Sequence, residues 1–234
     1  MTAFSTVPPE ILEAIRHFDT CTVANAIENF PVRLKNEGYT QPGLQCVTGG
    51  CPRVLGYAAT FLVRSADPPV TGGGYWDRND WWDSIEQLPS PRIAVIQNPE
   101  SQVKIGAGAV LGSVHAAILL AFRCEGVVTD GVVRDVPEAA RMEFPMFARG
   151  MAVSHAYTHI VEFGSPVEIF GLKVRPGDLL YADCHGALSI PLEIAGRIPA
   201  EAARIRAREQ GIIELCRSRE FSRERLWRAI RNRD

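Results

Sequence analysis

The chain has 234 residues, a mass of 25.7 kDa and a formal net charge of −2, and 46% of its residues are hydrophobic. This length and composition suit one globular domain, and the near-neutral charge argues against a dedicated nucleic-acid binder, which carries a strong basic excess. The sequence has neither an apolar run long enough to cross a membrane nor a signal peptide, so we expect a cytoplasmic protein.

The N-terminal part of the chain predicts two short helices, within about residues 9–29, and then a strand. In residues 9–17, prolines precede apolar residues at helical spacing. Asp19 can cap a second helix over 21–29. β-branched and aromatic residues at 53–63 predict the strand.

Residues 67–84 are rich in Pro and Gly and also hold a cluster of aromatic side chains. We expect a long loop that leads into a short helix. The aromatic side chains could line a substrate pocket or pack at a subunit interface, and we predict packing. They are Tyr75, Trp76, Trp81 and Trp82.

The middle of the chain alternates strands and helices, which is typical of a layered α/β fold. A buried strand at 92–97 leads into a glycine-rich turn at 105–112 and an apolar helix at 113–124. A second strand, 126–130, leads into the turn 131–135. Because the two turns follow consecutive strands, we expect them to lie side by side.

The last part of the chain predicts strands and then charged helices. Short β segments separated by Gly and Pro fill 144–190 and include a hairpin in FGLKVRPGD. A helical extension follows at about 192–231, and residues 197–234 carry 11 Arg against six acidic residues. No linker is visible, so we expect a single domain, 1–234.

The C-terminal helices carry an apolar stripe, which favours docking on the body or on a neighbouring subunit over RNA contact. The stripe consists of Ile205, Ile212, Ile213, Leu215, Leu226, Trp227 and Ile230.

Cysteine and lysine usage restrict the chemistry. The six cysteines include no C-x-x-C pair, so we expect reduced thiols rather than a disulfide framework, with Cys124 in the core. Only three basic residues are Lys, and a Schiff-base enzyme needs a desolvated Lys. Lys35 falls in a polar stretch and Lys173 in a turn, which leaves Lys104 as the one candidate. A metal route is therefore favoured.

The two turns carry groups suited to an anion and a metal. Backbone N–H groups where a helix follows a glycine-rich turn can hold an anion, although these glycines could equally serve tight packing. Arg134 offers a planar fork for a carboxylate or keto oxygen, and Asp135 offers a hard oxygen ligand for Mg²⁺ or Mn²⁺. Taken alone, Arg134 and Asp135 could form surface ion pairs. Because their turn and the glycine-rich turn follow neighbouring strands, we expect an anion site and a metal site to lie together there.

His155 and His159 form an H-x-x-x-H pair in a stretch whose pattern is that of a strand. Their side chains would then lie about 13 Å apart, at roughly 3.3 Å per residue, and one zinc ion cannot bridge that distance. A single histidine near the site stays open, with His155 the best candidate. His115, at the start of the predicted helix, is the other.

Two segments resemble the RraA-like family: GSVHAAILLAFRCEGVVTDGVVRDVPEAARMEFPMFARG and RPGDLLYADCHGALSIP. The likeness covers most of residues 20–215. The family includes metal-dependent 4-hydroxy-4-methyl-2-oxoglutarate / 4-carboxy-4-hydroxy-2-oxoadipate aldolases, oxaloacetate decarboxylases and RraA regulators of ribonuclease E. Its hallmark is an acidic residue, twenty residues and then Arg-Asp. Here Arg134 and Asp135 match, whereas Ser113 replaces the acid and Asn25 replaces a frequent Asp.

The resemblance implies an α/β sandwich of the swivelling, phosphohistidine-domain-like type, assembled as homotrimers or homohexamers with sites between subunits. It implies that Asp135 binds Mg²⁺ or Mn²⁺ directly and that Arg134 binds the keto oxygen and stabilises the enolate. Glu209 from a neighbouring subunit would complete the water network, with Glu214 as a competitor. Substrate-binding residues would be Gly112, Ser113, Val114, His115 and Arg134.

We therefore expect a divalent-metal-dependent lyase that cleaves a small 2-keto acid and releases pyruvate. The reaction would be retro-aldol cleavage of a 4-hydroxy-2-oxo acid or decarboxylation of oxaloacetate, and Ser113 tilts slightly towards decarboxylation. Two alternatives stay open. One is a non-catalytic regulatory binding protein, and the other is a hydratase or isomerase on the same scaffold. We expect neither nucleic acid nor membrane as a partner.

Overall fold

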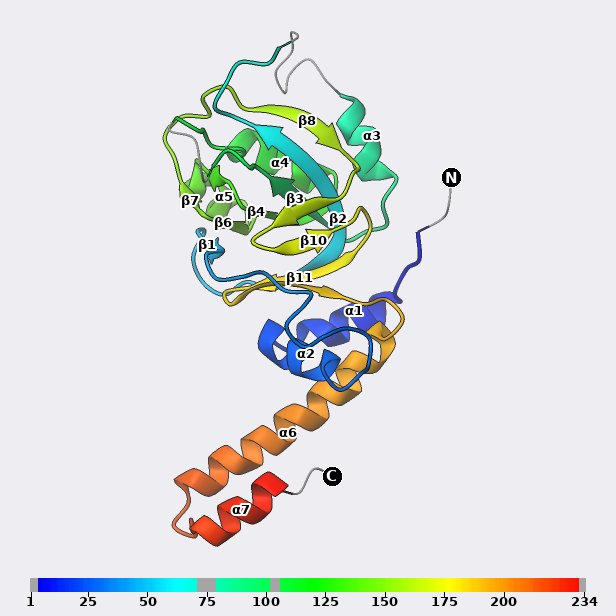
Figure 1. The fold of residues 1–234 in the computed structure, drawn as a ribbon, viewed down its shortest axis with the longest axis vertical. Coiled ribbons are helices and arrows are strands. Elements are labelled where there is room, and N and C mark those ends of the chain that lie inside the picture. Colours follow the sequence, from blue (N-terminus) through cyan, green and yellow to red (C-terminus); the bar gives the residue numbers. More distant parts are fainter. Residues whose placement is uncertain (1–3, 71–78, 102–105, 232–234) are drawn as a thin grey trace.

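The computed structural model describes residues 4–70, 79–101 and 106–231. Within them the chain forms a mixed α/β protein, as the sequence predicts, around an eight-stranded sheet (Figure 1). Its strand order is β1-β6-β4-β3-β2-β11-β12, and β8 also pairs with β2. The sheet strands are β1 (Gln45–Cys46), β2 (Val54–Arg64), β3 (Arg92–Gln97), β4 (Cys124–Thr129), β6 (Met146–Ala148), β8 (His159–Phe163), β11 (Leu179–Asp183) and β12 (Gly186–Ile190).

Two short strand pairs and a set of helices complete the fold. The short strands are β5 (Val132–Val133) with β7 (Gly150–Met151), and β9 (Val167–Ile169) with β10 (Leu172–Val174). The helices are α1 (Pro9–Arg16), α2 (Thr20–Ile27), α3 (Asp80–Glu86), α4 (Ser113–Ala121), α5 (Val136–Arg141), the 3₁₀ helix η2 (Ala195–Arg197), α6 (Ile198–Arg217) and α7 (Arg223–Arg231). No helix in the described parts is long and apolar enough to span a membrane.

The long strand β2 organises the core because its side chains alternate between the two faces of the sheet. Leu55 and Tyr57 pack against the N-terminal helices, and Phe61, further along the same face, packs against α3 and α4. Ala58, on the opposite face, packs under the β9–β10 hairpin. The core strands β2, β3 and β4 run parallel, so their carboxyl ends meet at one edge.

The N-terminal helices form where the sequence predicts them. The Asp19 side chain accepts a hydrogen bond from the Thr22 N–H at 2.7 Å, which caps α2. Arg16, in the last turn of α1, donates to the Leu55 carbonyl and lies 2.5 Å from Glu125. These bonds fix α1 against the sheet.

Packing is confirmed for the aromatic side chains that the structure describes, but they pack in the chain's own core rather than at a subunit interface. Trp81 is 4% exposed and meets Phe61 edge to face, and Trp82 stacks on Phe122. Tyr75 and Trp76 lie outside the described residues. Cys124 is also buried, at the start of β4 rather than at a helix end, and burial raises the pKa of its thiol to about 12.

The C-terminal helices α6 and α7 extend away from the sheet, and α7 folds back beside α6 (Figure 1). Of the predicted apolar stripe, only Ile205 packs against a core cluster. Ile213, Trp227 and Ile230 are exposed in the single chain, and α7 buries no residue. Docking of the stripe on the chain's own body is therefore wrong for most of its length, and docking on a neighbouring subunit stays a prediction.

The expectation of six reduced thiols is wrong for two of them. Cys51 and Cys184 form a disulfide with their Cα atoms 4.8 Å apart. They are 133 residues apart in sequence, and only the pairing of β11 with β2 brings them together. The free cysteines are Cys21, Cys46, Cys124 and Cys216.

Candidate active site

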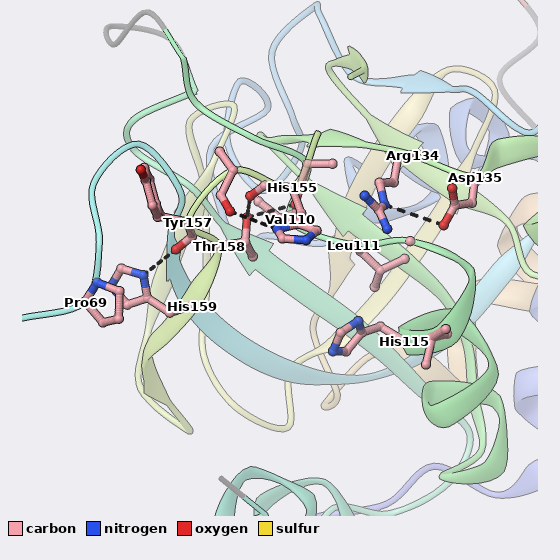
Figure 2. A pocket seen from close by; sticks show the side chains of 14 residues that line it. Pro69, Val110, Leu111, His115, Arg134, Asp135, His155, Tyr157, Thr158 and His159 are labelled. Carbon is pink, nitrogen blue, oxygen red and sulfur yellow. Dashed lines mark hydrogen bonds and ion pairs between the residues drawn. The ribbon is translucent and has the colours of Figure 1, made fainter. Parts of the chain in front are cut away.

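A cavity of about 340 Å³ opens beyond the carboxyl ends of the central parallel strands. Three segments form its walls: the glycine-rich turn with the start of α4, the Arg-Asp turn, and the loop before β8. Arg134 and Asp135 lie at one end and Pro69, Tyr157 and His159 at the other (Figure 2). The lining residues are Pro69, Ala109, Val110, Leu111, Gly112, Val114, His115, Arg134, Asp135, His155, Ala156, Tyr157, Thr158 and His159.

The two turns meet, as their positions after consecutive strands predict. The Val110 N–H donates to the Val132 carbonyl at 2.8 Å, and the Arg134 N–H donates to the Leu111 carbonyl at 2.9 Å. These ladder-like bonds join the glycine-rich turn to β5. They hold the Arg-Asp pair beside the first turn of α4.

Asp135 has a left-handed backbone, with φ 55° and ψ 32°, at the N-cap of α5. This conformation is costly for most residues but is tolerated by Asp, and it often marks functional sites. Oδ2 of Asp135 accepts from the N–H and the Oγ–H of Ser113, both at 3.1 Å, and lies 3.6 Å from Arg134 Nε. The backbone hydrogen bond from Ser113 is the main cause that lowers the Asp135 pKa, helped by the Ser113 hydroxyl and Arg134.

Gly112 allows this approach because a side chain would occupy the same space. A Cβ at Gly112 would lie 2.7 Å from Asp135 Oδ2 and 3.2 Å from Arg134 Nε. Gly112 therefore leaves room for the Asp135 carboxylate in addition to forming the turn. Neither a phosphate loop nor a dinucleotide fingerprint is needed to explain it.

The predicted substrate cradle is modified at Ser113. Gly112, Val114 and His115 line the cavity, but the Ser113 N–H is already bound to Asp135. Val114 occupies the second position of α4, where an N–H has no acceptor within the helix. Anion binding at this turn stays a prediction, and Val114 supplies a backbone N–H that can serve it.

His115 lies on α4 and points into the cavity below Arg134 (Figure 2). Burial is the main cause that lowers its pKa, and the charges of Arg134 and His155 act in the same direction. A histidine with a lowered pKa is neutral at physiological pH, so it can accept a proton or a hydrogen bond. It is the better placed of the two histidines that the sequence left open.

The prediction that residues 152–163 form one strand is wrong for its first half. Strand β8 begins at His159, and His155 lies in a loop that folds over the glycine-rich turn. The Ala109 N–H donates to the Ser154 carbonyl at 2.8 Å, and Thr158 Oγ1 donates to the Ala109 carbonyl at 2.9 Å. Both His155 and His159 consequently line the cavity.

A buried polar network holds Gly108 of the glycine-rich turn, and no sequence motif pointed to it. Ser65 Oγ accepts from Asn98 Nδ2 and from the Gly108 N–H, at 2.9 and 3.0 Å. Glu100 Oε2 accepts from the Ser65 N–H, and Asp130 Oδ1 accepts from the Asn98 N–H at 2.6 Å. Burial raises the Asp130 pKa. The available signal was that Ser65, Asn98 and Asp130 directly follow the strands β2, β3 and β4.

Neither predicted interface acid lines the cavity of its own chain. Glu209 lies on α6 with Oε1 3.5 Å from Asn25 Nδ2, and Glu214 accepts from Gln210. Their service to a neighbouring subunit stays a prediction. Asn25 in place of Asp avoids a second negative charge beside Glu209.

The described lysines are also absent from the lining. Lys35 pairs with Glu28 at 3.1 Å, and Lys173 lies in β10 rather than in a turn. Lys104 lies outside the described residues.

The donor set suits a hard divalent cation that keeps most of its water. Asp135 is the only carboxylate in the described lining, and its two hydrogen bonds and its ion pair converge on Oδ2, which leaves Oδ1 for an ion. Mg²⁺ is typically bound through one or two carboxylates together with waters and substrate. Within the described ranges, the one cluster of three or more metal-ligating side chains is Cys51, Asp183 and Cys184, which does not line this cavity.

Residues 20–188 match the RraA-like family model, described as Aldolase/RraA. The chain is 34% identical over 142 residues to an uncharacterized protein of Methanocaldococcus jannaschii, covering 58% of this chain and 66% of that one. It is 36% identical over 67 residues to a Halalkalibacterium halodurans protein provisionally named 4-hydroxy-4-methyl-2-oxoglutarate aldolase, covering 28% and 32%. The matches thus span less than two thirds of these relatives.

The fold also matches a solved structure. The crystal structure of Streptomyces coelicolor RraAS2, an unusual member of the RNase ES inhibitor RraA protein family, superposes with a TM-score of 0.69. The match covers 88% of this chain and 97% of that one, at 20% sequence identity. At this identity the likeness concerns the fold alone.

Proposed function

The chain belongs to the RraA-like family, and from this premise we propose that it is a divalent-metal-dependent lyase for a small 2-keto acid. The reaction is retro-aldol cleavage of a 4-hydroxy-2-oxo acid or decarboxylation of oxaloacetate, and either releases pyruvate. The observation that carries the proposal is Asp135, held in a left-handed conformation beside Arg134 at the end of a cavity. The name of the H. halodurans relative points the same way.

The residues of the chain divide the work by position. A metal at Asp135 would supply Lewis-acid polarisation of the keto acid. Arg134 binds the keto oxygen and stabilises the negative charge that develops as the carbon–carbon bond breaks. The Val114 N–H binds the substrate carboxylate at the start of α4. His115, neutral because its pKa is lowered, accepts a proton or orients water.

The assembly belongs to the same proposal. We infer a homotrimer or homohexamer in which Glu209, or Glu214, reaches the cavity of a neighbouring subunit. The exposed apolar side chains of α6 and α7 supply a surface for such contact. The sheet with its covering helices is then a sandwich of the swivelling, phosphohistidine-domain-like type, in a single domain and a cytoplasmic setting.

Pyruvate release tests the proposal directly. The protein is incubated with Mg²⁺ or Mn²⁺ and either 4-hydroxy-4-methyl-2-oxoglutarate or oxaloacetate, and pyruvate is measured. We expect release from at least one substrate, above the release measured with metal and substrate alone, and its loss on chelation. No release from either substrate would favour a non-catalytic regulatory protein. The likeness to the RraAS2 structure concerns the fold and does not by itself support that alternative. A hydratase or isomerase would convert the acid without releasing pyruvate.

Substituting Ser113 by Asp is expected to raise aldolase turnover, because it restores the acid that the family hallmark places there. Ser113→Ala is the matched control. It removes only the hydroxyl donor to Asp135 and should bring the Asp135 pKa back towards its ordinary value. Turnover and metal dependence are measured for both variants. No change, or a loss, with Ser113→Asp would show that the site does not use an acid at this position.

The pH profile of kcat/KM is expected to show an acidic limb caused by His115. Its pKa is lowered, so the neutral form prevails above its ordinary value of about 6.5, and activity falls only as pH drops below that value. Asp135, whose pKa is also lowered, stays ionised throughout this range. Rates between about pH 5 and 8 test this. His115→Gln should remove the limb, and an unchanged profile would contradict the assignment.

A further inference from the structure

The disulfide between Cys51 and Cys184 lies in a part of the molecule that the proposed lyase does not use. Cys51 precedes β2, and Cys184 lies in the tight turn between β11 and β12. Both residues are exposed, and neither lines the cavity of Arg134 and Asp135. A disulfide exposed to solvent is open to attack by a thiolate, whereas a buried one is not.

Each sulfur of the disulfide has a potential hydrogen-bond donor beside it. The Cys184 N–H donates to Cys51 Sγ at 3.3 Å. His185 Nδ1 lies 3.7 Å from Cys184 Sγ and 3.1 Å from Asp183 Oδ1. Because Nδ1 faces an acceptor-only carboxylate, it carries a proton in this arrangement. A nearby hydrogen-bond donor stabilises a thiolate. Either sulfur is therefore a better leaving group than a cysteine sulfur that has no donor beside it.

A carboxylate between two cysteines could also suggest a metal site, but Asp183 is already saturated. Its Oδ2 accepts from the Thr20 N–H at 2.8 Å, and its Oδ1 accepts from Thr20 Oγ1 at 2.7 Å and from the His185 N–H at 2.8 Å. The Asp183 side chain is fully buried. Its role is to tie the first residue of α2 to the end of β11 and to orient His185. The reactive chemistry is therefore that of the sulfur pair.

Space for a small molecule adjoins His185. A second cavity, of about 280 Å³, has His185 in its wall together with Lys35, Tyr39 and Thr40. Its wall also includes Cys21 at the start of α2. Burial raises the pKa of the Cys21 thiol, so this thiol forms the reactive thiolate less readily than an ordinary cysteine. The cavity borders His185 but not the two cysteines, so access to the disulfide itself comes from the exposure of Cys51 and Cys184.

We propose that Cys51–Cys184 is a thiol–disulfide exchange site for small thiols, in which the Nδ1–H of His185 stabilises the departing thiolate. An incoming thiolate attacks Cys51 Sγ, and Cys184 leaves as a thiolate that accepts a hydrogen bond from His185 Nδ1. A second thiolate attacks the mixed disulfide and releases Cys51 with a small-molecule disulfide. Two thiols are oxidised as the protein disulfide is reduced, and the two protons that they lose protonate Cys51 and Cys184. The reverse reaction closes the bond.

Thiol counting tests whether the bond exists and whether it opens in the native protein. The full chain, purified without reductant, is denatured and alkylated, and its mass is measured. We expect four alkylated cysteines, matching the four free ones, and six after native incubation with reduced glutathione. Six before incubation would overturn the proposal, and so would reduction that requires denaturant.

The kinetics test the role of His185. The rate of native reduction should be proportional to glutathione concentration, and His185→Ala should slow it about 3- to 10-fold. Cys216→Ser, which alters an exposed cysteine on α6, is the matched control and should leave the rate unchanged. In Cys51→Ser, which frees Cys184, the added His185→Ala change should shift the pH profile of Cys184 alkylation upward. An unchanged rate and profile would overturn the role of His185. Neither result depends on lyase activity.

Discussion

Replacing Asp135 by Asn is expected to lower kcat/KM for pyruvate release by at least about 10²-fold. The substitution keeps the shape of the side chain but removes the negative charge that Ser113 and Arg134 stabilise. An amide nitrogen facing the Ser113 N–H or Arg134 would also place donor against donor. Initial rates are measured across a Mg²⁺ titration, and the apparent metal affinity should fall together with kcat/KM.

Glu138→Gln is the matched control for this substitution. Glu138 lies on α5 one turn after Asp135, but it faces solvent and pairs with Arg141. The Glu138→Gln variant therefore loses one negative charge at the same helix without changing the cavity. Its kcat/KM should stay within about twofold of the parent. Both variants should melt close to the parent, because exposed ion pairs contribute little to stability. Full activity in Asp135→Asn would refute the metal assignment.

The meeting of Arg134 with the glycine-rich turn could be predicted because it depends on strand order alone. Consecutive parallel strands β3 and β4 bring their following turns to one edge of the sheet. The same logic explains what was missed. Ser65, Asn98 and Asp130 also stand directly after strands, yet nothing in the spacing shows that they bond to one another beneath the turn.

Two errors came from contacts between segments distant in sequence. The stretch before His159 has a strand-like composition, but the Ser154 carbonyl accepts from the Ala109 N–H and the Tyr157 N–H donates to the Ser65 carbonyl, so the stretch does not continue β8. Propensity in β segments is readily overridden by such tertiary contacts. Similarly, Cys51 and Cys184 show no motif, because their closeness depends on the antiparallel pairing of β11 with β2. Local pattern carries no information on either contact.

Ser113, which stands where the family hallmark has an acid, shows what a family resemblance leaves open. The missing acid suggested a weakened site, but the structure shows that Ser113 donates to Asp135 through both its N–H and its hydroxyl. An Asp at this position would keep the N–H donor, lose the hydroxyl donor and add a carboxylate that can hold water. The rise in turnover expected for Ser113→Asp therefore requires the added carboxylate to outweigh the lost hydroxyl bond. Ser113→Ala loses the same hydroxyl bond without adding a carboxylate, so it separates the two effects.

Gly108→Ala is expected to destabilise the protein by about 2–4 kcal/mol, because the added methyl group would overlap backbone. A Cβ at Gly108 would lie 2.3 Å from the carbonyl carbon and oxygen of His155 and 2.7 Å from the Ala156 nitrogen. Backbone atoms cannot rotate away as a side chain can, so the loop that carries His155 must lift from the turn. We expect Tm to fall by roughly 5–15 °C, measured by calorimetry. The displaced loop also forms a wall of the cavity, so KM should rise in any variant that still folds.

Gly150→Ala separates this steric effect from the loss of glycine itself. Gly150 lies in β7, close in sequence to the same loop, but a Cβ built there meets no atom within 4 Å and its φ is not positive. The variant should therefore keep the parent's Tm within about 2 °C, or gain slightly because alanine restricts the unfolded chain. Equal losses in both variants would mean that backbone freedom, rather than contact with His155, makes Gly108 necessary. A loss confined to Gly108→Ala would show that the cavity depends on close packing of two loops whose contact no local pattern predicts.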